Sequence, residues 1–173
     1  MSLKTLVSIL NDDEIIKELL SRFRCAYDES QVENFLHNDA IKYDRNGWCR
    51  TYIFTNNDFS VVFGFFSVGI QNLKFAKSIS NETKYELTSK KVHNSASPCF
   101  VLAQIGKCDG CNLPKGILLE TAVNTVKNIH DGIGGCFICL DCKPELCNYY
   151  SRVGFNKLHE NDYDVQMVLK LTN

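Results

Sequence analysis

The segment from Cys99 to Phe155 constrains the fold more than any other part of the sequence. It contains, in order, the apolar stretch Cys99 to Gly106, a loop ending in Pro114-Lys115-Gly116, the amphipathic stretch Ile117 to His130, the apolar stretch Cys136 to Leu140, and a short helix over Pro144 to Tyr150. Two apolar strands joined by an amphipathic helix form a β-α-β unit, with the strands side by side. The segment therefore predicts an α/β fold with a layout that suits a bound cofactor.

The rest of the chain supplies helices and strands around this unit. The expected elements are a strand over Thr5 to Leu10, a helix capped by Asn11 with a buried stripe of Ile15, Ile16, Leu19, Leu20 and Phe23, a helix from the capping box Ser30-x-x-Glu33 to Asn46-Gly47, a hairpin of Arg50 to Thr55 and Phe59 to Gln71, and a final strand over Asp164 to Leu171. The stretch Leu73 to Asn94, rich in lysine and in polar turn formers, is expected to be a solvated excursion or a flap facing substrate or nucleic acid.

The length and the net charge limit which classes of protein the chain can belong to. The 173 residues fit a single domain over positions 1–173, and the formal net charge of -1 gives no overall attraction to nucleic acid or to an anionic membrane. We find no apolar run near the roughly 20 residues needed to span a bilayer, and no signal-peptide pattern at the start of the sequence. These features predict a cytoplasmic protein without a membrane association.

The nine cysteines are an odd number in a chain without an export signal, which favours reduced thiols over a disulfide framework. Cys108-x-x-Cys111 and the set Cys136, Cys139 and Cys142 have spacings that suggest zinc. Residues three apart on a strand point to opposite faces, however, so we expect no metal site. Cys139 or Cys142 as a nucleophile is an alternative to a core thiol, and the dispersed His37, His93, His130 and His159 are expected at the surface.

The loop before the Ile117 helix has the character of an anion site. A helix N-terminus offers unpaired backbone N–H groups and a partial positive charge. Lys107, Asn112, Lys115 and Gly116 surround this point, and Asn112 is expected to cap the helix with Pro114 in its first turn. The arrangement predicts a ligand that carries phosphate.

The stretch Tyr149-Tyr150-Ser151-Arg152-Val153-Gly154-Phe155, together with the order of elements, resembles the GCN5-related N-acetyltransferase (GNAT) family, whose late helix ends in an aromatic-Tyr-x-x-x-Gly-Phe signature. The resemblance covers the chain from about Arg50 to its end. It implies a mixed, largely antiparallel seven-stranded sheet flanked by helices. It also implies acetyl-CoA as cosubstrate, bound in an opening between the fourth and fifth strands, and direct transfer of acetyl to an amine.

The resemblance also implies roles for individual residues. Backbone groups near Leu102, Gln104 and Gly106 would pair with the pantetheine, while amides of the Lys107 to Gly116 loop would hold the pyrophosphate. Tyr150 matches the tyrosine that donates a proton to the leaving thiolate, which suits a phenol because it is protonated at neutral pH. Tyr149 is expected to be structural. Asp141 is the candidate general base, with a chain of water molecules as the alternative.

The phosphate loop departs from the family pattern of Arg or Gln, two residues, Gly, one residue, then Gly or Ala. Gly110, Leu113 and Lys115 stand at those positions, although glycine is what lets backbone approach phosphate closely. Either Lys115 supplies charge in place of that geometry, or the chain is a non-catalytic CoA-sensing or protein-binding module. A third hypothesis is a toxin-like aminoacyl-tRNA acetyltransferase, with lysines of Leu73 to Asn94 contacting the RNA. The resemblance further suggests a homodimer.

Overall fold

The computed structural model describes residues 2–5, 13–26, 30–90 and 96–171, which form two compact units. The first unit comprises Met1–Gly69 and Ala103–Leu118, and the second comprises Ile70–Leu102 and Leu119–Asn173. The strands form one seven-stranded sheet in the order β1-β2-β3-β4-β5-β7-β6. Of the strand pairs with a described register, only β4–β5 is parallel. The predicted α/β fold with a mixed, largely antiparallel seven-stranded sheet is confirmed.

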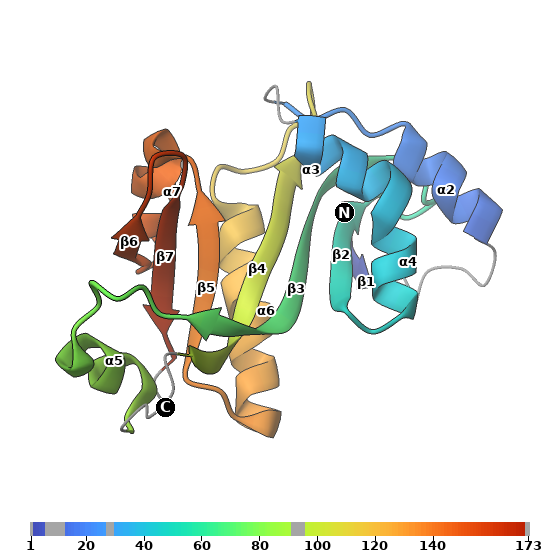
Figure 1. The fold of residues 1–173 in the computed structure, drawn as a ribbon. Coiled ribbons are helices and arrows are strands. Elements are labelled where there is room, and N and C mark those ends of the chain that lie inside the picture. Colours follow the sequence, from blue (N-terminus) through green and yellow to red (C-terminus); the bar gives the residue numbers. More distant parts are fainter. Residues whose placement is uncertain (1, 6–12, 27–29, 91–95, 172–173) are drawn as a thin grey trace. The chain divides into compact units, whose positions relative to one another are not determined.

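Figure 1 shows these elements along the chain. They are β1 (Ser2–Thr5), α2 (Asp13–Ser21), α3 (Ser30–Asn34), the π-helical turn η1 (Phe35–Asp39), α4 (Ala40–Arg45), β2 (Cys49–Thr55), β3 (Val62–Lys74), α5 (Asn81–Thr88), β4 (Ala96–Lys107), α6 (Ile117–Ile133), β5 (Phe137–Cys142), the 3₁₀ turn η2 (Pro144–Leu146), α7 (Cys147–Ser151), β6 (Asn156–Glu160) and β7 (Val165–Lys170).

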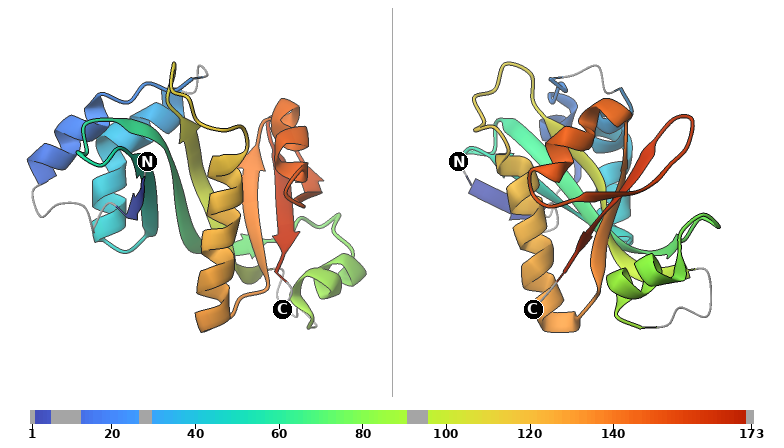
Figure 2. Two further views of the ribbon diagram at one scale, coloured as in Figure 1. Left: turned by 180° about the vertical axis from the view of Figure 1, so that it is seen from behind. Right: turned by 90° about the vertical axis from the view of Figure 1, so that its left-hand side faces the viewer.

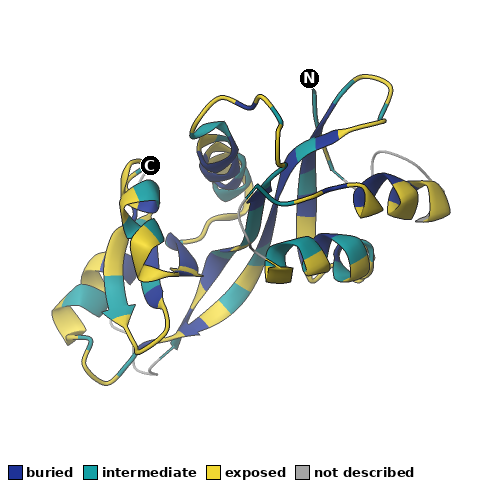
Figure 3. Ribbon diagram, turned by 90° about the horizontal axis from the view of Figure 1, so that it is seen from above, coloured by how far each residue is buried: buried dark blue, intermediate teal, exposed yellow. Residues whose placement is uncertain are grey.

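The core of the first unit forms where its helices pack on β2 and β3. The buried side chains of this core are Ile16, Leu19, Leu20, Phe23, Leu36, Ala40, Ile53, Val62 and Phe65. Helix α2 buries one face and exposes the other (Figure 3). Ile15 was expected in the buried stripe but is 52% exposed. Ile16, Leu19 and Leu20 make the contacts with the core instead. The predicted strand over Thr5 to Leu10 and the cap at Asn11 lie largely outside the described residues.

The second predicted helix begins at Ser30 but is not continuous. A π-helical turn separates α3 from α4, and the amide of Ala40 donates to the carbonyl of Phe35, five residues earlier. The capping box is not formed as predicted, because Glu33 Oε2 accepts a 2.9 Å hydrogen bond from the backbone N–H of Cys25 instead. This bond ties the helix to the segment that follows α2.

The hairpin of β2 and β3 is confirmed, with Tyr52 opposite Phe66 in an antiparallel register. Strand β3 begins at Val62 rather than at Phe59. The side-chain oxygen of Asn56 accepts hydrogen bonds of 3.0 Å from the amides of both Ser60 and Val61, which closes a longer turn. Phe59 adopts a φ of 57° within that turn and so cannot continue a strand.

In the second unit, β5 lies between β4 and β7, and α5 and α6 lie on opposite sides of these strands (Figure 2). The parallel register of β4 and β5 comprises Phe100↔Ile138 and Val101↔Cys139. The final strand is confirmed as β7, which pairs antiparallel with both β5 and β6. The hydrophobicity pattern did not predict β6, because only Leu158 and His159 in it are even partly buried.

Most described residues of the segment Leu73 to Asn94 are exposed, as expected for a solvated excursion, but the segment also contains a strand end, a helix and core contacts that were not expected. Strand β3 continues to Lys74, and helix α5 follows, capped by the Ser80 hydroxyl, which accepts from the amide of Thr83. Leu73, Phe75 and Leu87 are buried in a cluster with Cys99 and Phe137. These apolar side chains anchor the segment to the core of its unit, while residues 91–95 lie outside the described part.

Helix α6 runs past the predicted stop at Asp131-Gly132. It ends at Ile133, because Gly134 takes a φ of 79° and donates its amide to the carbonyl of His130 at 2.7 Å. Among the described helices, none is long and apolar enough to cross a membrane.

Candidate functional site

The predicted site residues fall into two groups, one in each unit. Gln104, Gly106, Lys107, Asn112, Lys115 and Gly116 belong to the first unit, at the end of β4 and in the loop that follows it. Leu102, Asp141 and Tyr150 belong to the second.

The loop from Cys108 to Gly116 is held at its start by backbone hydrogen bonds. The amide of Cys108 donates to Phe63 O at 2.9 Å, and the amide of Asp109 donates to Arg24 O at 2.7 Å. Farther along, Leu113 is buried, and its Cδ1 lies so near Gly64 that a Cβ there would come within 3.0 Å. The loop is therefore fixed to β3 at both positions.

Three backbone amides of the loop lack a hydrogen-bond acceptor among the described residues. Those of Gly110, Cys111, Leu113 and Ile117 donate to neighbouring oxygens. Those of Asn112, Lys115 and Gly116 have no hydrogen-bond acceptor in the part of the chain that the structure describes. Helix α6 starts at Ile117, after Gly116 with a φ of 89°, so Asn112 does not cap it as expected. These N–H groups lie in the loop that leads into the 17-residue helix.

Two lysines, Lys107 and Lys115, lie next to and within this loop. Lys115 is exposed, Lys107 is half-buried, and within the described ranges neither forms an ion pair with a carboxylate. Burial and the adjacent Cys108 thiol raise the pKa of the Cys111 thiol to about 11. The positive charge of Lys107 acts in the opposite direction. Asp109 Oδ1 accepts from the amide of Gly110 within its own loop at 2.9 Å. Unpaired amides and lysines together can bind an anion.

Glycine occurs where packing requires it rather than at the family's phosphate positions. A Cβ on Gly106 would lie 2.9 Å from both Phe65 Cε1 and Val32 Cγ1. At the three positions of the family pattern, Gly110 has a φ of 66°, Leu113 is buried and Lys115 is exposed. The departure seen in the sequence thus persists in the structure, with Leu113 serving as the apolar anchor of the loop.

In the second unit, Tyr150 lies on α7 and is 7% exposed. Its ring packs edge-on against Tyr149 at 5.2 Å and against Phe155 at 6.1 Å between ring centroids. Gly154 takes a φ of 98°, which turns the chain from α7 toward β6 and lets Phe155 reach the core. The Gly-Phe part of the signature therefore positions the tyrosine ring.

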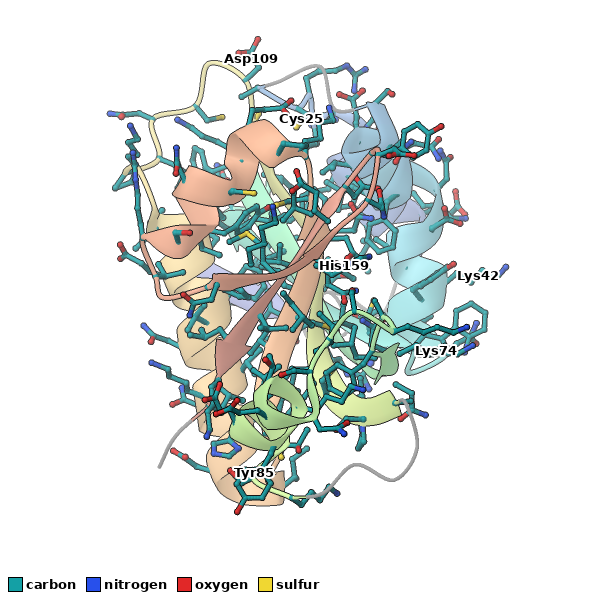
Figure 4. The ribbon with its side chains drawn as sticks, turned by 60° about the vertical axis from the view of Figure 1, so that its left-hand side comes forward. Cys25, Lys42, Lys74, Tyr85, Asp109 and His159 are labelled. Atoms are coloured by element: carbon teal, nitrogen blue, oxygen red, sulfur yellow. The ribbon has the colours of Figure 1, made fainter. Side chains whose placement is uncertain are left out.

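Asp141 and Leu102 lie on neighbouring strands of the second unit. Asp141 is exposed near the end of β5, and its Oδ1 accepts a 3.2 Å hydrogen bond from Gln166 Nε2 on β7. Gln166 is also opposite His159 on β6, whose position Figure 4 shows. Leu102 is buried and comes one residue after Val101, the last residue of β4 in the described register with β5.

A cluster around Cys139 was not predicted from the sequence. Its Sγ lies 3.3 Å from Cys99 Sγ and accepts a 2.9 Å hydrogen bond from Gln71 Nε2. No local pattern signals it, since the three residues come from different strands. Burial and Cys147 raise the pKa of Cys142 to about 12, which suits a core thiol rather than a nucleophile. Among the described residues, no group of three or more His, Cys, Asp or Glu is placed to hold a metal ion.

Solved structures of similar fold identify the architecture. A crystal structure of AtaTR bound with AcCoA matches with a TM-score of 0.74 at 18% identity, over 98% of this chain and 93% of that one. A tyrosine-to-phenylalanine mutant of KacT matches with a TM-score of 0.74 at 14% identity, over 98% and 94%. AtaT complexed with acetyl-methionyl-tRNAfMet matches with a TM-score of 0.72 at 19% identity, over 95% and 92%.

The fold of the chain is thus similar to that of AtaT and KacT over nearly its whole length, and the fold that the GNAT resemblance implied is confirmed. The sequence itself matches no family model and no curated protein.

Proposed function

We propose that the chain is an N-acetyltransferase that uses acetyl-CoA and transfers acetyl directly to an amine. The observation that carries the proposal is the loop before α6, where the amides of Asn112, Lys115 and Gly116 are without an acceptor in the described chain. An anionic diphosphate fits such a helix N-terminus. The likeness to an AtaTR structure bound with AcCoA supports the identity of that anion.

The first unit would hold the nucleotide end of the cosubstrate. The three amides would bind the pyrophosphate oxygens, and Lys107 and Lys115 would add charge. Lys115 stands where the family pattern has Gly or Ala, so its ammonium would replace part of the close backbone contact. Backbone groups near Leu102, Gln104 and Gly106 would pair with the pantetheine. Acetyl-CoA supplies the activated thioester, and the chain supplies binding and proton transfer.

Tyr150 is proposed as the general acid. Its ring is held by Phe155 and Tyr149, so its hydroxyl has a restricted position. A phenol is protonated at neutral pH and can donate that proton to a departing thiolate. Tyr149, which is less buried, is proposed to support the ring rather than to react.

Asp141 is proposed as the base that takes a proton from the acceptor amine, directly or through water. Its carboxylate is exposed, so an acceptor amine or a water molecule can reach it. The hydrogen bond from Gln166 Nε2 orients one oxygen and leaves the other available. This assignment is independent of the acid assigned to Tyr150.

Aminoacyl-tRNA is the second candidate for the acceptor. One specific observation favours it, namely the match over nearly the whole chain to AtaT complexed with acetyl-methionyl-tRNAfMet. Exposed Lys74, Lys77 and Lys90 in and around α5 would offer phosphate contacts. The net charge of -1 argues against extensive RNA binding, so any such contact would be local. A single acetyltransferase domain over residues 1–173, a homodimer and a cytoplasmic location remain proposals.

The proposal is tested by incubating the purified chain with radiolabelled acetyl-CoA and three acceptor sets: mixed aminoacyl-tRNA, the same tRNA without amino acids, and small primary amines. We expect label on the amino group of one set and none on uncharged tRNA. Release of CoA without label on any amine would contradict acetyl transfer. Tight binding of acetyl-CoA with no transfer to any acceptor would favour the CoA-sensing module.

A further inference from the structure

Cys25 and Cys108 face each other across an isolated antiparallel bridge. The flanking amides make its two hydrogen bonds, from Ala26 N to Lys107 O at 2.8 Å and from Asp109 N to Arg24 O at 2.7 Å. Cys25 and Cys108 are therefore a non-hydrogen-bonded pair of the bridge, in which neither backbone bonds to the other. Figure 4 shows Cys25 and Asp109 close together in this region.

The geometry of such a pair suits a disulfide. Residues opposite each other without their own backbone hydrogen bonds have Cα atoms about 4.5 Å apart, and their side chains lie on the same side. Disulfides join Cα atoms about 4.4–6.8 Å apart. The pair therefore lies at the short end of the range in which a bond forms without moving the backbone.

Access to solvent distinguishes Cys25 and Cys108 from Cys99 and Cys139. Cys25 and Cys108 are both partly exposed. Cys99 and Cys139 have their sulfurs 3.3 Å apart, but these residues are 3% and 1% exposed, and a small-molecule oxidant does not reach them in the folded chain.

We propose that Cys25 and Cys108 form a reversible disulfide that covalently links the start of the Cys108–Gly116 loop to the segment after α2. The oxidant is a small-molecule disulfide, with oxidised glutathione as the probe. The Cys108 thiolate attacks one sulfur of glutathione disulfide and releases one glutathione thiolate. The Cys25 thiolate then attacks Cys108 Sγ and releases the second. Two protein thiols are oxidised, one glutathione disulfide is reduced to two thiols, and the protons move to the released thiolates through solvent.

Cys111 is the competing partner for Cys108. The two form a Cys-x-x-Cys turn in which Cys111 N donates to Cys108 O at 3.4 Å. Burial and the Cys108 thiol raise the pKa of Cys111 to about 11, so it remains protonated at neutral pH and attacks slowly. The position of Cys25 opposite Cys108 follows from the backbone bridge and does not depend on the pKa of Cys111.

The crosslink would close a covalent ring from residue 25 to residue 108, which restricts the unfolded chain and stabilises the first unit. It would also fix Lys107 to Asp109, where the loop begins. The inference goes beyond the proposed function, because the disulfide would form whether or not the loop binds acetyl-CoA. Inside cells, disulfides of this kind are transient and respond to the redox state.

The test treats the purified full chain with oxidised glutathione, blocks remaining thiols, and maps disulfides by mass spectrometry. Cleavage before aspartate separates Cys108 from Cys111, since Asp109 lies between them. We expect a Cys25–Cys108 linked peptide that dithiothreitol removes, and an unfolding midpoint a few degrees above that of the reduced chain. The rise should persist in Cys111→Ser and disappear in Cys25→Ser.

Three results would overturn the proposal. The first is Cys108–Cys111 as the main disulfide of the wild-type chain. The second is glutathione adducts on Cys108 that never proceed to a protein disulfide. The third is a midpoint rise that remains in Cys25→Ser. Because the peptide mapping uses the wild-type chain, the proposal can fail even if a variant does not fold.

Discussion

The rings of Tyr150 and Phe155 pack edge to face, with centroids 6.1 Å apart and an interplanar angle of 71°. Gly154 makes this contact possible because its positive φ reverses the chain between the two rings. One aromatic ring thus holds the other at the end of α7. The arrangement links the late sequence signature to the residue proposed as general acid.

Tyr150→Phe should abolish most acetyl transfer and leave the fold intact. The substitution keeps the ring and its contact with Phe155 but removes the hydroxyl that is proposed to donate the proton. Loss of a general acid typically lowers the rate by about 10²–10⁴-fold. The measurement is kcat with the acceptor that takes up label in the acetyl-CoA assay proposed above. Tyr149→Phe is the matched control and should retain a rate near that of the wild type; equal losses in both variants would remove Tyr150 from its proposed role.

Lys115→Ala should weaken acetyl-CoA binding about tenfold, which corresponds to about 1.5 kcal/mol for a charge-assisted contact to phosphate. The side chain is exposed, so the fold should not change. Titration calorimetry at two salt concentrations measures the effect, and the loss should shrink at high salt because mobile ions screen the lysine. Lys127→Ala, an exposed lysine farther along α6, should bind like the wild type. Equal affinities of both variants would argue against a phosphate contact by Lys115.

Gly106→Ala should destabilise the chain by about 1–3 kcal/mol, because the added methyl group would overlap Phe65 and Val32 in the first unit. Urea denaturation measures the change. Gly132→Ala provides a control with space around it, since no atom lies within 4 Å of a Cβ built there. That control should gain about 0.5–1 kcal/mol from its higher helix propensity. Unchanged stability of Gly106→Ala would mean that β4 does not pack on α3 as described.

Asp44→Ala should cost about 1–3 kcal/mol. The buried carboxylate accepts from Thr51 N at 2.7 Å and from Arg50 Nη1 at 2.9 Å, so its removal leaves a buried amide without an acceptor. The free energy of unfolding in urea is the readout. Asp131→Ala, at an exposed site on α6, should change it by less than about 0.5 kcal/mol. A small effect at Asp44 would show that Thr51 N finds another partner.

The sequence predicted the elements whose apolar residues follow a clear period. The β-α-β unit, the β2–β3 hairpin and β7 each have such a pattern, and each is present. Strand β6 has none, because only Leu158 and His159 in it are partly buried. The π-helical turn was not predictable either, since it depends on where Leu36 and Ala40 meet the strands rather than on local propensity.

Tertiary contacts explain the remaining errors. A mostly polar run separates Leu73 and Phe75 from Leu87, so the sequence did not indicate a buried segment, yet the three side chains pack together with residues from β4 and β5. Asparagine is a favoured residue at a helix N-cap, so Asn112 was a reasonable prediction. Leu113 is buried in the core, however, and α6 begins only at Ile117. The pair Cys25 and Cys108 is far apart in sequence, so no spacing rule connects the two.

Thermal unfolding with and without acetyl-CoA tests the central claim most directly. The account predicts a higher midpoint in reducing buffer with chelator, because a ligand at 100 times its Kd adds about 2.7 kcal/mol and shifts the midpoint by a few degrees. The shift should be smaller at the same ligand concentration in Lys115→Ala. An unchanged midpoint at millimolar acetyl-CoA would contradict the proposal that the Lys107 to Gly116 loop holds this cosubstrate.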